Sequence, residues 1–122
     1  MFSIFKKASQ ADVEMTRRSI MKLHTMWHDQ GYQKFYFELM RYHHELGNDS
    51  AADDALKRKN AIEHLLSESL RACNSTALSN QKAQTMVFTK VSSALNLLEK
   101  ISTMAYNEDI PFKELIPKPS NT

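Results

Sequence analysis

Glycine, proline and cysteine are all scarce in this chain of 122 residues, which holds two glycines, three prolines and one cysteine. Two glycines cannot build the G-x-G-x-x-G turn of a dinucleotide-binding fold, and no G-x-x-x-x-G-K-[ST] run is present to cradle a phosphate. The one cysteine, Cys73, cannot close an intrachain disulfide or supply a C-x-x-C pair, which favours a reducing, cytoplasmic compartment. Rossmann, P-loop and zinc-finger functions are therefore excluded.

Long apolar runs and a strong charge of one sign are also missing. No stretch approaches the roughly 18 residues of a membrane span, and residues 1–8 lack the apolar region and cleavage site of a signal peptide. The formal net charge is +2, from 16 Lys and Arg against 14 Asp and Glu. This charge is too small to imply a nucleic-acid or membrane partner by itself. We expect an unprocessed, soluble protein without a membrane span.

The helix breakers are distributed in a way that favours an all-α fold. The three prolines lie near the C-terminus, and Gly31 and Gly47 are the only glycines before them. Hydrophobic spacing and capping residues predict helices at about residues 10–30, 32–46, 51–73 and 77–106. Because the connections are short, we expect an antiparallel four-helix bundle. The expected domain covers residues 1–107, including a short N-terminal segment, and residues 108–122 form an extended or mobile C-terminal tail.

Helix ends and core faces can be located from the same patterns. Ser9 is the expected cap of the first helix, and a left-handed Gly31 and Gly47 are expected to end the first and second. The first core stripe is predicted from residues on one face of that helix, namely Val13, Thr16, Ile20, Leu23, His24 and Trp27. In the last helix the predicted stripe is Val87, Val91, Ala94, Leu95, Leu98, Ile101 and Ala105.

Histidines are the first candidates for chemistry. His24 and His28 are four residues apart, the spacing at which two imidazoles on one helix face can share a metal. No Glu-x-x-His motif accompanies them, and His44 fails to start H-E-x-x-H because Asn48 occupies the second ligand position. We therefore predict no metal and no cofactor, although metal binding by the first pair stays open. We expect His24 and His43 to be buried or half-buried, and the other three histidines to lie at the surface.

Residues for catalysis are equally sparse. Cys73 falls on the predicted core face of the third helix, where a thiol is usually inert. No G-x-S-x-G motif surrounds any serine, and no cofactor motif is present. The sequence therefore predicts a protein that is not an enzyme.

The helix expected at residues 32–46 carries the most aromatic surface. One apolar stripe contains Tyr32, Phe35, Leu39, Tyr42, His43 and Leu46. A second group, rotated to the side, contains Phe37, Met40 and His44, and Tyr36 lies between the two. Either this is a central helix covered by its neighbours and the tail, or the second group is an exposed contact surface. Tyr, Phe, Met and Arg are enriched in the centres of protein interfaces. The predicted partner-binding residues are Tyr36, Phe37, Met40, Arg41 and His44.

The leading hypothesis is a helical adaptor, inhibitor or accessory subunit that binds another protein, or itself as a homo-oligomer. The alternative is a nucleic-acid-associated helical subunit or regulator that uses scattered basic residues, namely Arg17, Arg18, Lys22, Lys57, Arg58 and Lys59. Interleaved acids also allow a simpler interpretation of these groups as solvated helix faces with intrahelical pairs. No small-molecule substrate is indicated.

Overall fold

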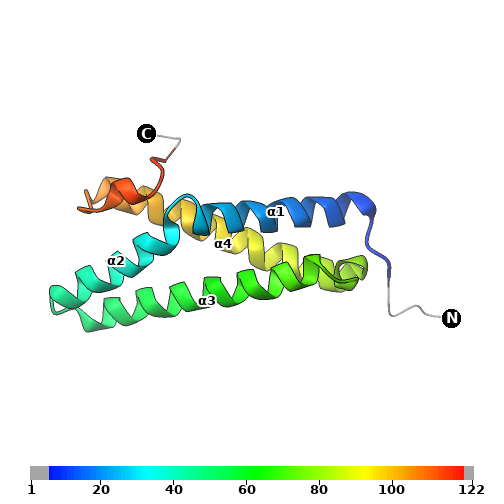
Figure 1. The fold of residues 1–122 in the computed structure, drawn as a ribbon, viewed down its shortest axis with the longest axis horizontal. Coiled ribbons are helices and arrows are strands. Elements are labelled where there is room, and N and C mark those ends of the chain that lie inside the picture. Colours follow the sequence, from blue (N-terminus) through cyan, green and yellow to red (C-terminus); the bar gives the residue numbers. More distant parts are fainter. Residues whose placement is uncertain (1–5, 120–122) are drawn as a thin grey trace.

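The computed structural model describes residues 6–119, and within this range the protein is all-α, which confirms the predicted fold class. The elements in chain order are α1 (Gln10–His28), α2 (Tyr32–Glu45), α3 (Asp49–Cys73), the short 3₁₀ helix η1 (Ala77–Ser79), α4 (Gln81–Asn107) and the 3₁₀ turn η2 (Lys113–Leu115). The helices pack on one another as a bundle (Figure 1). No helix in residues 6–119 combines the length and apolarity that crossing a bilayer requires.

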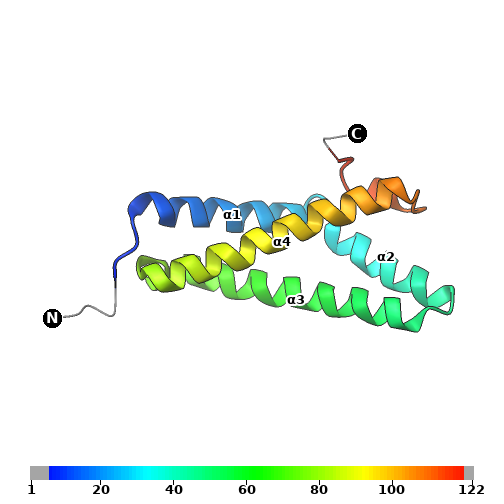
Figure 2. The ribbon, with the colours of Figure 1, turned by 180° about the vertical axis from the view of Figure 1, so that it is seen from behind.

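α1 and α2 lie along one side of the bundle, α3 lies along the other, and α4 packs across α1 and α3. α1 and α2 follow one another in nearly the same direction, and α3 runs back beneath both of them (Figures 1 and 2). α3 forms its most extensive contacts with α2, whereas α1 packs chiefly on α4. The expected antiparallel order thus holds for α2 with α3 and for α3 with α4. The joint between α1 and α2 bends the chain without reversing it.

Side-chain caps define the N-terminal ends of α1, α3 and α4. Ser9 Oγ accepts a hydrogen bond from the backbone N–H of Asp12 at 3.1 Å, and Asn48 caps α3 in the same way. Asn80 caps α4 by accepting from the N–H of Ala83 at 3.0 Å. Because Asn80 has an extended backbone, it separates η1 from α4 and divides the helix predicted at 77–106.

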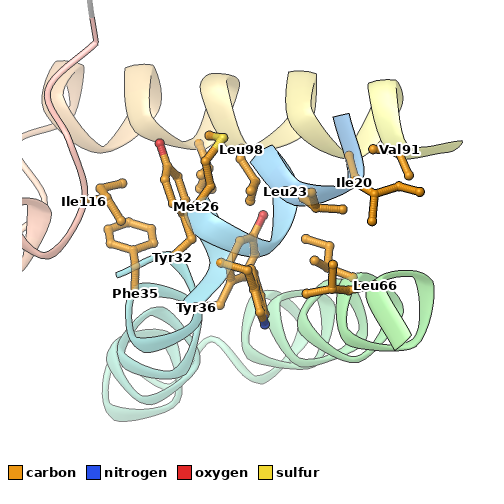
Figure 3. Close-up of a cluster of buried hydrophobic side chains, with 14 of the residues drawn as sticks. Ile20, Leu23, Met26, Tyr32, Phe35, Tyr36, Leu66, Val91, Leu98 and Ile116 are labelled. Carbon is orange, nitrogen blue, oxygen red and sulfur yellow. The ribbon is translucent and has the colours of Figure 1, made fainter. Parts of the chain in front are cut away.

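The core is built where α1, α3 and α4 meet and continues beneath α2 (Figure 3). α1 buries Val13, Thr16, Ile20, Leu23, Met26 and Trp27. Most of the predicted stripe is therefore confirmed, with Met26 buried and His24 only half-buried. One polar link crosses this core, since Gln84 donates to Thr16 Oγ1 at 2.6 Å and both side chains are buried. Pairing satisfies groups that would otherwise be costly to bury.

The segment 108–119, which we call the strap, packs against α2 and α4. The Phe112 ring lies 5.1 Å from that of Phe35, measured between centroids, and Ile116 is 2% exposed. Figure 3 shows Ile116 beside Phe35, in the first turn of α2. The hydroxyls of Ser102 and Tyr106 donate to the backbone carbonyls of Pro117 and Ile116. Apolar burial and these hydrogen bonds therefore fix the strap. Residues 120–122 of the expected tail lie outside the described range.

Candidate functional site

An open cleft lies beside α2, where the helix meets the strap. Its volume is about 750 Å³. We call it the α2 cleft, and its lining residues are Gln33, Lys34, Phe37, Glu38, Lys59, Phe112, Glu114 and Leu115. Phe37 is 46% exposed and Leu115 is 37% exposed, so apolar surface remains open to solvent there. Charged side chains from three segments surround this apolar surface.

Four of the five predicted partner-binding residues reach the surface of α2. Phe37 lines the cleft, and Met40 is half-buried against the core. Arg41 and His44 are exposed farther along α2, and neither lines the cleft. Arg41 pairs with Glu38 at 3.4 Å within its own helix. The structure therefore brings Phe37 together with residues of the strap rather than with the rest of the predicted group.

Tyr36 is a correction to the predicted partner-binding set. Its side chain is only 1% exposed and its ring lies 5.7 Å from that of Trp27, so it belongs to the core. Burial raises the pKa of the Tyr36 hydroxyl to about 12. Tyr36, which lies between the two apolar groups of α2, points inward because α3 and α1 cover that side of the helix. Both interpretations of α2 hold in part, with one side covered and Phe37 left exposed.

The residues of the strap that line the cleft were not among the predicted partner-binding residues. Phe112, Glu114 and Leu115 line it although they are separated from Phe37 by most of the chain. The sequence signal that could have located these residues is the apolar content of the segment IPFKELIP within an otherwise polar tail. That signal indicates docking, but it does not specify which helix face receives the segment.

Glu63 links α2 to α3 at the edge of the cleft. Gln33 Nε2 donates to one carboxylate oxygen at 2.6 Å and Lys59 Nζ donates to the other at 2.8 Å. Burial of Glu63 opposes its ionisation, but the hydrogen bonds from Lys59 and Gln33 outweigh it and lower the pKa. The indole N–H of Trp27 adds to this effect without reaching hydrogen-bond geometry. The carboxylate thereby holds two cleft-lining side chains in place.

Acidification is expected to weaken this link. Because the folded pKa of Glu63 lies below its ordinary value of 4.5, the ionised group stabilises the fold above that value. This stability is lost as the pH falls through the folded pKa. The free energy of unfolding should therefore drop less for Glu63→Gln than for the wild type between about pH 6 and about pH 3. Urea unfolding across this range measures the difference.

Glu68→Gln is the matched control for this experiment. Glu68 also lies on α3, but it pairs with Arg71 at the exposed surface, where an ion pair contributes little. The Glu68→Gln variant should follow the wild-type pH dependence. If Glu63→Gln also showed the wild-type pH dependence, the hydrogen bonds from Gln33 and Lys59 would not be stabilising the ionised carboxylate.

His24 and His28, the candidate metal pair, lie close together on α1. The rings of His24 and His28 lie 4.8 Å apart, but no group of three or more potential ligands gathers within residues 6–119. His24 and His43 are half-buried and the others are exposed, as expected. Cys73 is half-buried, and burial raises the pKa of its thiol. A raised thiol pKa disfavours the reactive thiolate.

The predicted nucleic-acid-binding residues are divided between α1 and α3. Arg17 pairs with Glu14 at 3.6 Å, and Lys59 pairs with Glu63. The remaining four are exposed, namely Arg18, Lys22, Lys57 and Arg58. Of these, Arg18 and Lys22 line a second cleft, whose lining also includes the end of the strap.

Comparison of this chain with protein-family models, with curated proteins and with solved structures finds no match. The fold and the site are therefore defined by structure alone. They describe an all-α helical-bundle protein whose docked C-terminal strap and second helix enclose an open, partly apolar cleft.

Proposed function

We propose that this protein is a non-enzymatic adaptor, inhibitor or accessory subunit that binds another protein through the α2 cleft. The observation that carries the proposal is the exposure of Phe37 and Leu115 within one cleft of about 750 Å³. Open apolar surface of this kind, bordered by polar residues, is typical of protein-binding sites.

The cleft has the composition that a protein interface needs. Phe37 and Phe112 supply aromatic surface, and aromatic residues commonly dominate the binding energy of interfaces. Lys34, Glu38 and Glu114 form a charged border of both signs, which suits a polar interface rim. We expect an apolar side chain of the partner to enter between Phe37 and Leu115, as an anchor residue enters a groove.

Substitution of Phe37 tests this proposal. The Phe37→Glu variant should lose partner binding, because a charge would be desolvated at the centre of the interface. Its expected loss of affinity is about 30-fold or more, equivalent to about 2 kcal/mol. Quantitative affinity purification from an extract of the source cells would identify proteins that wild type retains and the variant does not. Isothermal titration with each identified protein then gives the affinity.

Met86→Glu is a matched control, because Met86 is 48% exposed and Phe37 is 46% exposed. Met86 lies on α4, outside the α2 cleft, so this variant should bind like the wild type. Equal losses in both variants would show that binding does not use the cleft. Circular dichroism must show unchanged helicity in both variants, since Phe37 is not a core residue.

A second copy of the chain is another possible occupant of the cleft. Sedimentation equilibrium distinguishes this case, because self-association through the cleft would disappear in Phe37→Glu and persist in Met86→Glu. The nucleic-acid alternative has less support, since Arg17 and Lys59 already pair with acids. Binding to a phosphate backbone would weaken steeply with salt, whereas an apolar interface should not.

A further inference from the structure

A second cleft lies between α1, α4 and the end of the strap, and its volume is about 560 Å³. α1 contributes Arg18 and Lys22, and the strap contributes Lys118. We call this the cationic cleft. Its walls also contain Ser102 of α4 and Tyr32, the first residue of α2. The volume is within the range of roughly 300–1,000 Å³ that is common for small-molecule sites.

The charges lining this cleft are unbalanced. Arg18, Lys22 and Lys118 face a single acidic lining residue, Glu99. None of the three cations forms an ion pair with another residue of the described range 6–119. Arg18 and Lys22 are four residues apart on α1, so their like charges are neighbours on the helix surface and repel. A bound anion would offset this repulsion.

Docking of the strap brings the third cation to the cleft. The Ser102 hydroxyl donates to the carbonyl oxygen of Pro117 at 2.5 Å, and Lys118 follows directly. Ile116, which is 2% exposed, anchors the chain just before this bond. Lys118 thus joins two cations of α1 that lie about 100 residues before it in the sequence. Their arrangement is a product of the folded structure rather than of a local run of basic residues.

Neutral donors and an apolar surface complete the lining. Tyr32 and Ser102 are each 3% exposed, and the proton of the Ser102 hydroxyl is already donated to the carbonyl oxygen of Pro117. Thr25 adds an exposed hydroxyl, and Met21 adds a half-exposed thioether. The Thr103 hydroxyl also lines the cleft and donates to the carbonyl oxygen of Glu99. Guanidinium and ammonium groups together with hydroxyls are the donors that phosphate oxygens require. The methionine offers contact to the organic part of a ligand.

We propose that the cationic cleft binds the phosphate group of a small organic phosphate. Arg18 supplies a planar pair of donors, while Lys22 on the same helix and Lys118 on the strap supply point charges. Glu99 accepts a hydrogen bond from a hydroxyl of the organic part. This site is separate from the α2 cleft, so it can be correct whether or not the proposed protein partner exists.

Titration of the isotopically labelled full chain with inorganic phosphate tests the site. Ionic strength is held constant with chloride, and backbone amide shifts are followed by NMR. We expect saturable shifts at Thr25, Ser102, Thr103 and Lys118. The double variant Arg18→Gln/Lys22→Gln should weaken binding about tenfold or more, because two charge-assisted contacts are lost.

Lys57→Gln/Lys90→Gln is the matched control, since it removes two positive charges from exposed positions outside this cleft. It should bind phosphate like the wild type. If the double variant of α1 loses helicity, Lys118→Gln provides the same test from outside the helices. Its binding should also be weakened.

Four results would overturn the proposal. The first is a linear response of the amide shifts to phosphate without saturation. The second is wild-type affinity in both Arg18→Gln/Lys22→Gln and Lys118→Gln. The third is binding of succinate as tight as that of phosphate, which would assign the cleft to carboxylates. The fourth is preferential binding of a short single-stranded oligonucleotide that is lost in Lys57→Gln/Lys90→Gln. That result would identify the ligand as a nucleic acid rather than a small organic phosphate.

Discussion

Replacing Gly31 by alanine is expected to destabilise the protein far more than the same replacement of Gly47. Both glycines have a left-handed backbone, with φ of 84° and 75°, so each alanine should cost about 1–2 kcal/mol from conformation alone. A Cβ at Gly31 would in addition overlap the carbonyl oxygen of Leu115, whereas a Cβ at Gly47 meets no atom within 4 Å. The difference between the two variants therefore isolates the contact with the strap.

The Gly31→Ala variant must shift either the helix joint or the strap. Displacement of the strap would expose Ile116, which alone is worth about 1.5–3 kcal/mol of apolar burial. We expect a total loss of about 3–5 kcal/mol for Gly31→Ala, measured by urea unfolding. Hydrogen exchange at the amides of Leu115 and Ile116 should accelerate in this variant and not in Gly47→Ala. Equal destabilisation of the two variants would show that the strap does not lie against Gly31.

Truncating Trp27 to alanine is expected to lower the free energy of unfolding by about 3–5 kcal/mol. The indole is fully buried at 0% exposure, and its ring lies 5.7 Å from that of Tyr36. It therefore joins α1 to α2 on the side where α3 covers both. The removed side chain would leave a cavity that two rigid helices cannot close. Urea unfolding at neutral pH measures this loss.

Two further variants make the Trp27 experiment decisive. Trp27→Phe retains most of the buried ring and should lose substantially less stability than Trp27→Ala. Met86→Ala truncates a side chain that is 48% exposed and should change stability by no more than about 0.5 kcal/mol. A loss below about 1 kcal/mol in Trp27→Ala would contradict the described packing.

The helical elements could be predicted closely because their signals are local. Ser9, Asn48 and Asn80 accept hydrogen bonds from the first turns that follow them, and such caps depend on only a few adjacent residues. The predicted core stripe of α1 is largely buried for the same reason. Met26 was missed because α1 packs on three neighbours, so its buried face is wider than one stripe.

The candidate site could be predicted only in part. Phe37 was placed in the partner-binding set while its exposure was left open, and the structure leaves it exposed because it lies opposite the main apolar stripe of α2. Tyr36 was misplaced, since a position between two apolar groups can turn to either side and the packing of α1 and α3 decided its direction. Leu115 and Phe112 were not assigned to the site, because their contacts with α2 join positions about 75 residues apart in sequence, beyond the reach of helical periodicity.

The sequence by itself determined the all-α class, the positions of the helices and their main core faces, because helix propensity, capping and hydrophobic periodicity act over a few residues. Only the tertiary structure decided that α2 continues the course of α1, where the strap docks and which side chains line the two clefts. Those features depend on contacts between distant segments, such as Leu115 against Gly31 and Ile116 against the first turn of α2. Such contacts are selected by the shape and burial of the assembled core, which no local pattern encodes.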